Sequence, residues 1–169
     1  TGKVFGAVMG ANSMYDMANQ FDLYNNGGLD ICFMGGIEVD KHGNVNAHRG
    51  PGAFAGIGGF ANITAKTKTV VFCLTFNTSG LSVDENDGLI TLKNNGNIPK
   101  FVDKVTSISF SAKRARTNKQ KVLYVTERCV FELGENGLRL IEVYPGIDIE
   151  NDILKLLPFK VEIDPLLTY

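Results

Sequence analysis

Several residue types and patterns that would mark a protein class are scarce in this sequence. The formal net charge is only −1, so no basic field points to nucleic acid as a partner, and no apolar run is long enough to cross a membrane as a helix. The only histidines, His42 and His48, have no third ligand at a suitable spacing, so we expect both at the surface and no bound metal. The G-x-S-x-G motif of serine hydrolases is also missing.

Cysteine is scarce as well. Cys32, Cys73 and Cys129 are too far apart for a zinc knuckle or a C-x-x-C motif. Cys32 and Cys73 lie in apolar, strand-like runs, so we expect them to be buried, reduced thiols of a cytosolic protein. Residues 1–10 do not combine a basic start with an apolar core, as a signal peptide would. The sequence therefore predicts a cytoplasmic location.

The composition fits one domain over residues 1–169. The chain is 44% hydrophobic, enough for a substantial core, and it shows no internal repeat, low-complexity segment or linker. Strand-like runs outnumber helical patterns. We therefore expect an α/β fold with an open mixed β-sheet flanked by helices, rich in strands.

The first half of the chain alternates apolar runs with turns. A short helix is expected over residues 12–21, with Met14 and Met17 packed in the core. The continuous apolar run at residues 29–35 is typical of a strand that is covered on both faces. Turn residues between 40 and 44 favour a hairpin.

The rest of the chain carries further strand and turn signals. The strands expected there include residues 69–76, 106–111 and 159–163, and a run over residues 121–133 that breaks at Glu127-Arg128. Asn136-Gly137 predicts a hairpin to a strand over residues 138–143. Asp148 is a suitable N-cap for a helix that Pro158 ends.

The most unusual stretch is a glycine-rich loop before the strand at residues 69–76. It contains Gly50, Gly52, Gly56, Gly58 and Gly59. Glycine allows close approach to the backbone, so the exposed N–H groups can face a phosphate or a developing oxyanion. Residues 56–61 match the dinucleotide pattern G-x-G-x-x-A, but no strand precedes the loop and no long helix follows, which disfavours a Rossmann site. An anion-binding loop and a tight structural turn both remain open.

A basic run at residues 113–121 also leaves two interpretations. It contains Lys113, Arg114, Arg116, Lys119 and Lys121. These side chains could contact a phosphate group, but most such runs are solvated loops.

A series of longer motifs runs along the chain. They are Q-F-D-L-Y-N-N-G-G-L-D-I-C-F-M-G (20–35), V-D-K-H-G-N-V-N (39–46), G-I-G-G-F-A-N-I-T (56–64), K-T-V-V-F-C-L-T-F (68–76), V-L-Y-V-T-E-R-C-V-F-E-L (122–133) and G-L-R-L-I-E-V-Y-P-G-I-D-I-E-N-D-I-L (137–154). In this order they resemble the class I coenzyme A transferases over nearly the whole chain. The similarity is greatest to the acetate and propionate CoA-transferase branch, which also resembles the succinyl-CoA:3-ketoacid enzymes.

The resemblance implies transfer of CoA between a short-chain acyl-CoA and a carboxylic acid, with coenzyme A as a substrate and no metal. In the family a glutamate attacks the thioester, and CoA thiolate then converts the acyl-glutamyl anhydride into a glutamyl-CoA thioester. Each tetrahedral state needs N–H donors. The resemblance places the backbone amides of Gly58 and Gly59 at the oxyanion, and Gly56, Ile57, Phe60 and Asn62 beside the substrate or CoA. A side chain at Gly59 is expected to crowd the oxyanion while leaving the fold near native.

The resemblance also concerns the nucleophile. In the family the glutamate lies in an E-x-G-like motif shortly before the segment that residues 1–7 resemble. Glu38, Glu85 and Glu127 match other parts of the family, so none is expected to be the nucleophile. We therefore expect the C-terminal part of a CoA-transferase, inactive alone, which works with the N-terminal half of the same enzyme in a homo-oligomer. The alternative is a non-catalytic CoA- or nucleotide-binding module, or an assembly module.

Overall fold

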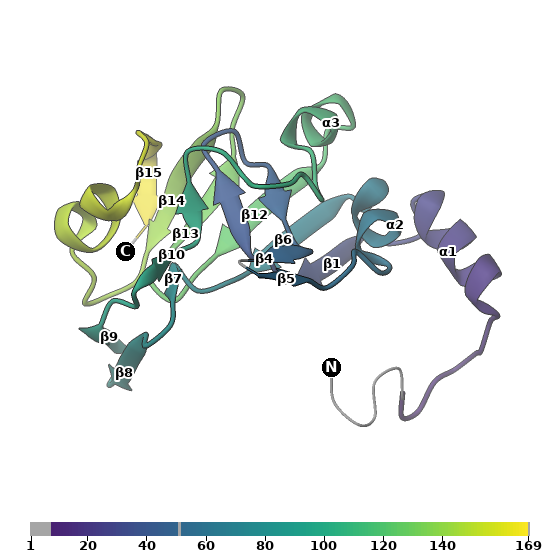
Figure 1. Cartoon of the computed structure of the whole chain (residues 1–169), viewed down its shortest axis with the longest axis horizontal. Helices are drawn as coiled ribbons and strands as arrows, with labels where there is room; N and C mark the ends of the chain where they lie inside the picture. The colour runs from purple at the N-terminus through teal and green to yellow at the C-terminus, as the bar shows by residue number, and fades with distance from the viewer. Residues whose placement is uncertain (1–7, 51, 169) are drawn as a thin grey trace.

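The centre of the molecule is an open, mixed sheet of six strands (Figure 1). This architecture comes from a computed structural model that describes residues 8–50 and 52–168. In spatial order the strands are β1 (Ile31–Met34), β6 (Thr69–Cys73), β12 (Lys121–Val125), β13 (Cys129–Leu133), β14 (Leu138–Val143) and β15 (Glu162–Thr168). β1, β6 and β12 are parallel, β12 to β14 are antiparallel, and β15 is parallel to β14. The predicted strand-rich α/β class is confirmed.

A second layer packs on one face of this sheet. It contains α2 (Phe60–Ala65), α3 (Ala112–Thr117) and a three-stranded sheet of β11 (Phe101–Val102), β2 (Glu38–Asp40) and β3 (Val45–Asn46). Aromatic rings fill the space between the layers, where the Phe72 ring centroid lies 5.1 Å from that of Phe110 and 5.4 Å from that of Tyr124. Burial of these rings gives the core much of its stability.

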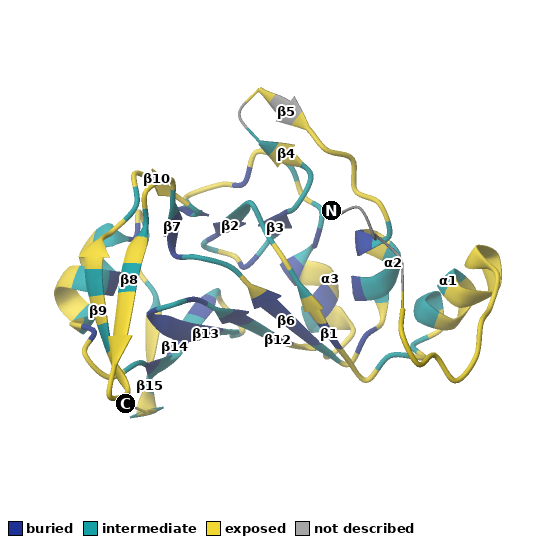
Figure 2. Ribbon diagram, turned by 90° about the horizontal axis from the view of Figure 1, so that it is seen from below, coloured by how far each residue is buried: buried dark blue, intermediate teal, exposed yellow. Residues whose placement is uncertain are grey.

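Smaller elements extend from the two layers. They are α1 (Met17–Asn25), the paired strands β4 (Arg49–Gly50) and β5 (Ala53–Phe54), β7 (Asn77–Thr78) and β10 (Ile98–Pro99), β8 (Ser82–Asn86) and β9 (Leu89–Asn94), the π-helical turn η1 (Ile149–Ile153) and the 3-10 turn η2 (Leu154–Leu156). α1 and the β8–β9 hairpin stand at opposite ends of the molecule (Figure 1). Figure 2 shows that this hairpin is largely exposed, whereas β6 is largely buried.

The expected hairpins are found where the turn signals predict them. Between β2 and β3, the Asp40 carboxylate accepts hydrogen bonds from the amides of His42 and Asn44, each 3.0 Å long. Gly43 in the same turn has a φ of +86°, which a residue with a side chain rarely adopts. The break at Glu127-Arg128 separates β12 from β13, and Asn136-Gly137 lies between β13 and β14.

Three predictions for the first half needed correction. The helix begins at Met17, because the Asp16 carboxylate accepts the Asn19 amide at 2.9 Å and so caps α1. Met14 and Met17 are 92% and 74% exposed, so neither packs in the core. β1 is not covered on both faces either, since Cys32 is buried while Phe33 on the opposite face is 67% exposed.

Three predictions for the second half also needed correction. Residues 106–111 form no strand and contribute only a single bridge, between Phe110 and Val45. Asp148 does cap a helical segment, accepting the Asn151 amide at 2.7 Å, but that segment is a π-helical turn followed by a 3-10 turn. The last strand is β15, which begins near the end of the predicted range 159–163.

Candidate functional site

The glycine-rich loop connects the β4–β5 hairpin to α2 at the protein surface. Gly56 and Gly58 have φ angles of +75° and +53°, in the left-handed region that glycine adopts without strain. A Cβ atom built on either residue would have no atom of the described residues within 4 Å, its chain neighbours aside. Glycine therefore sets the shape of this loop, and the space beside it is open to another molecule.

The backbone amides of the loop are available to a ligand. No hydrogen bond joins the N–H groups of Ile57, Gly58 or Gly59 to any residue that the structure describes. The next amide, of Phe60, donates to the carbonyl oxygen of Ile57 over 3.2 Å. Adjacent free N–H groups in an exposed turn can bind an anion or a carbonyl oxygen.

Two predicted site residues hold the loop in place. The Phe60 side chain is only 7% exposed, and its ring stacks on Phe72 with centroids 6.1 Å apart. The Asn62 side chain donates to Asn25 Oδ1 of α1 over 3.1 Å. The structure thus brings Gly56, Ile57, Gly58 and Gly59 together on one open surface, with the Phe60 ring in the core beneath it.

Gly59 differs from its neighbours. Its φ is −78°, but a Cβ atom there would lie 2.9 Å from Cε1 of Phe21 on α1. A side chain at position 59 would therefore have to displace the tip of the Phe21 ring, whereas Gly58 has open space, so Gly58 is the better position for a test. That a side chain at position 59 leaves the fold near native stays a prediction.

A histidine network supports the start of the loop. His48 Nδ1 lies 2.6 Å from Ser109 Oγ, and His48 Nε2 lies 3.3 Å from Ser107 Oγ. The carbonyl oxygen of His48 accepts the Ala55 amide over 2.9 Å, which joins the two sides of the β4–β5 hairpin. Sequence reasoning missed this network because the serines are about sixty positions away, and no local signal marks the pair.

The three glutamates considered above all make structural hydrogen bonds. Glu38 accepts the Thr106 amide over 2.8 Å, and Glu85 accepts the Gly88 amide over 2.8 Å within the β8–β9 turn. Glu127 accepts the Phe76 amide over 2.8 Å and pairs with Arg128. Each carboxylate is thus used to hold neighbouring backbone.

The cysteines differ from one another in exposure. Cys32 and Cys129 are buried, and burial raises the pKa of both thiols. Cys73 is exposed, so the prediction that it is buried was wrong. It ends β6 on the sheet face away from the second layer.

In residues 8–50 and 52–168, no three His, Cys, Asp or Glu side chains are grouped so that they could hold a metal ion. No helix in them combines the length and the apolar character needed to cross a bilayer.

Comparison with characterised proteins identifies the class of this fold. No protein-family model matches the chain. The acetate CoA-transferase YdiF of Escherichia coli is 42% identical over 97% of this chain, and the caffeate CoA-transferase of Acetobacterium woodii is 40% identical over 92%. The chain spans 31% and 30% of the lengths of these two relatives. The beta subunit of an acetate CoA-transferase of Haemophilus influenzae is 28% identical over 82% of the chain, which spans 52% of that subunit.

Solved structures agree with the sequence comparison. The acyl-CoA transferase YdiF from Escherichia coli O157:H7 superposes with a TM-score of 0.94 at 41% identity, over 96% of this chain and 32% of that one. Its thioester complex with CoA gives a TM-score of 0.91 at 41% identity, over 93% and 31%. The decarboxylase AibA/AibB, at 21% identity and a TM-score of 0.69 over 94% and 58%, shares the fold alone. The architecture is that of the coenzyme A transferases, and the chain belongs to the class I coenzyme A transferase family.

Proposed function

We propose that this chain supplies the amide-donating side of a CoA-transferase active site, in an enzyme that moves CoA between a short-chain acyl-CoA and a carboxylic acid. The observation that supports this most is the pair of free amides at Gly58 and Gly59, on a loop anchored by Phe60, in a chain of this family. Neither amide has an acceptor among the described residues, as an oxyanion site requires.

The proposed reaction has two half-reactions. A glutamate carboxylate adds to the acyl-CoA carbonyl carbon, CoA thiolate leaves, and an acyl-glutamyl anhydride forms. The thiolate then adds to the glutamyl carbonyl, which releases the acid and leaves a glutamyl-CoA thioester, and a second carboxylate takes up CoA by the reverse steps. Each addition places negative charge on one oxygen, which the amides of Gly58 and Gly59 stabilise.

The glutamate belongs, in this proposal, to another part of the enzyme. Glu38, Glu85 and Glu127 are engaged in structural hydrogen bonds, and the relatives are about three times as long as this chain. We therefore expect residues 1–169 alone not to exchange CoA between acetyl-CoA and propionate. Robust turnover by this segment would contradict the assignment of the nucleophile to another segment.

A matched pair of alanine variants tests the glycine loop. Gly58→Ala places a methyl group beside the free amides, and Gly88→Ala places one in the distant β8–β9 turn. Both positions have positive φ and open space, so the backbone strain is similar, about 1–2 kcal/mol. In the intact enzyme, acetyl-CoA to propionate exchange should fall at least about tenfold for Gly58→Ala and stay near wild type for Gly88→Ala. Equal activities would remove Gly58 from the site, and CoA binding without turnover by the wild type would favour a binding module.

A further inference from the structure

A small cleft runs along α2, next to the glycine loop. Its volume is about 160 Å³. Ala61, Thr64 and Ala65 line one wall, at the i, i+3 and i+4 spacing of a single helix face. The opposite wall is formed by residues 108–111, and Arg114 and Gln120 complete the lining. α2 follows directly after Gly59, so the loop and the cleft lie along one helix.

The cleft and the loop also share a framework of hydrogen bonds. Ser109, in the cleft wall, accepts the Ala47 amide over 2.8 Å and lies 2.6 Å from His48 Nδ1. His48 in turn accepts the Ala55 amide at the start of the glycine loop. The wall of the cleft is therefore fixed to the loop, and a long ligand could occupy both.

The charge of the cleft favours an anion. Arg114 is exposed, and its guanidinium makes no hydrogen bond or ion pair with the residues of the described ranges. No Asp or Glu lines the cleft. Carbonyl oxygens at the end of α2 are covered by side-chain amides, since Gln120 donates to Thr64 O over 2.9 Å and Asn118 donates to Ala65 O over 3.2 Å. The cleft thus presents a free cation with little opposing negative charge.

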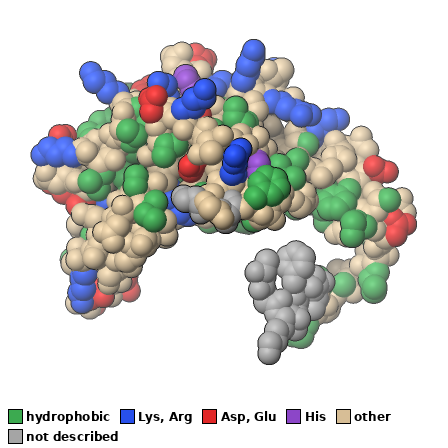
Figure 3. Space-filling model, viewed as in Figure 1, with side chains coloured by type: hydrophobic (Ala, Val, Ile, Leu, Met, Phe, Trp, Pro, Cys, Tyr) green, Lys and Arg blue, Asp and Glu red, His purple; other side chains and the backbone are tan. Residues whose placement is uncertain are grey.

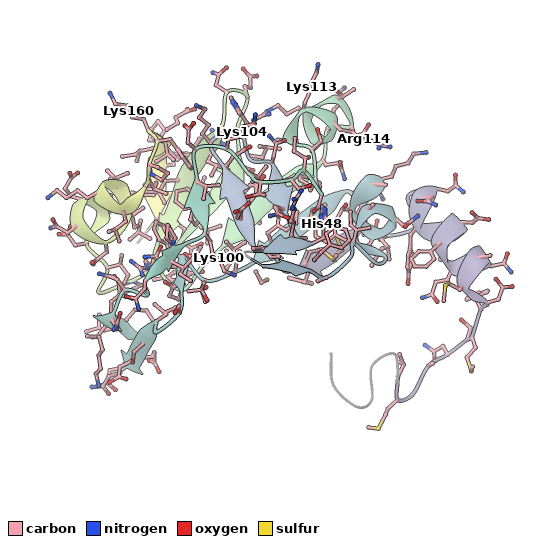
Figure 4. The ribbon with its side chains drawn as sticks, viewed as in Figure 1. His48, Lys100, Lys104, Lys113, Arg114 and Lys160 are labelled. Carbon is pink, nitrogen blue, oxygen red and sulfur yellow. The ribbon has the colours of Figure 1, made fainter. Side chains whose placement is uncertain are left out.

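The structure separates the roles of the basic run. Lys and Arg side chains stand along the upper rim of the view in Figure 3. Arg116 holds the backbone, donating to Gly134 O over 2.7 Å and to His42 O over 3.1 Å. Figure 4 shows Lys113 pointing away from the fold, whereas Arg114 leaves α3 on the side nearer α2. Among these side chains, Arg114 is placed to reach a ligand in the cleft.

We propose that Arg114 and the cleft along α2 bind a phosphate group of coenzyme A while the thioester lies at the glycine loop. This inference rests on the proposed function, because an acyl-CoA carries both a thioester and phosphates. The guanidinium fork can form two parallel hydrogen bonds to phosphate oxygens. Specificity for CoA over a shorter thioester would then come from this contact.

The test uses the intact enzyme with the variants Arg114→Gln, Arg114→Lys and Lys113→Gln. Lys113→Gln is the control, since it removes one neighbouring charge that points away from the cleft. Binding of adenosine 3′,5′-bisphosphate is measured by calorimetry, and kcat/KM is compared for acetyl-CoA and S-acetylpantetheine, which has no phosphate. Arg114→Gln should weaken bisphosphate binding and lower kcat/KM for acetyl-CoA about tenfold, with S-acetylpantetheine unaffected. Arg114→Lys should recover part of the loss, and Lys113→Gln should change binding less than about twofold.

Each outcome bears on the proposal. Unchanged bisphosphate binding by Arg114→Gln, or equal losses for both thioesters, would overturn it. If the wild type exchanges CoA and Arg114→Gln has unchanged bisphosphate binding and kcat/KM, the phosphate subsite is wrong but the proposed function stands. Arg114-dependent bisphosphate binding without any exchange would support the subsite and remove the proposed function.

Discussion

Replacement of Arg128 by methionine should destabilise the protein strongly. The Arg128 side chain is fully buried, and its guanidinium carbon lies 4.8 Å from the centroid of the Phe76 ring. Its nitrogens donate to Glu127 Oε1 (2.7 Å), Asn95 Oδ1 (2.9 Å), Asn95 O (3.0 Å) and Asp152 O (3.0 Å). This one side chain therefore joins the loop after β9, η1 and the β12–β13 turn.

The size of the effect follows from the groups that would lose their partner. The carbonyl oxygens of Asn95 and Asp152 would each lose a charged donor, at about 1–3 kcal/mol apiece. Glu127, only 16% exposed, would lose its ion-pair partner, although Lys100 lies near enough to attract it. Breaking a buried pair on one side costs about 3–5 kcal/mol, so we expect a loss of about 4 kcal/mol.

Urea unfolding of the purified protein measures this loss. With a slope of about 2 kcal/mol per M, the midpoint should fall by about 2 M. Lys93→Met is the control, because Lys93 is 59% exposed and pairs with Asp84, itself 53% exposed, on the β8–β9 hairpin. It should lose less than about 1 kcal/mol. A loss below about 1 kcal/mol for Arg128→Met, or equal losses for the two variants, would refute the argument from burial.

Two further predictions concern the cysteines. In the folded protein at pH 8, iodoacetamide should modify exposed Cys73 quickly and leave buried Cys32 and Cys129 unmodified. Peptide mass spectrometry measures the labelling, and rapid labelling of Cys129 would contradict its burial. Burial raises the pKa of Cys129 to about 12, above its unfolded value of about 8.5, so its contribution to stability is complete below about pH 8.5 and is lost as the pH rises toward 12. Between pH 7 and pH 9.5, the free energy of unfolding measured in urea should fall by about 1.4 kcal/mol more for the wild type than for Cys129→Ala. Parallel pH profiles of the two proteins would refute this.

Features written in short stretches of sequence could be predicted. Asn136-Gly137 and the turn around Gly43 mark hairpins because their backbone conformations need those residues locally. The glycine loop could be recognised for the same reason, as could the break before β13. Because Gly56 and Gly58 carry no side chains, the exposure of this part of the loop could be predicted from the local sequence.

Features set by distant contacts could not be predicted. Met14 and Met17 fit a buried helix face, but no other element of the described chain covers them. Phe33 lies in an apolar run, yet only one face of β1 is covered. Sequence alone also could not separate Arg114, whose guanidinium has no partner among the described residues, from Arg116, which donates to the carbonyl oxygens of Gly134 and His42.

The contacts between α1 and the glycine loop have a consequence for how often the site is assembled. No side chain of α1 is fully buried, so its detachment from α2 exposes little apolar surface, and its opening free energy should be far below that of the sheet. Detachment removes the Phe21 ring behind Gly59 and the Asn25 partner of Asn62. The loop amides would then be aligned only in the fraction of molecules with α1 docked. If the loop binds CoA as we propose, apparent CoA affinity would fall in proportion to that fraction. Any segment that contacts α1 in the whole enzyme would therefore set the fraction of molecules in which the loop amides are aligned.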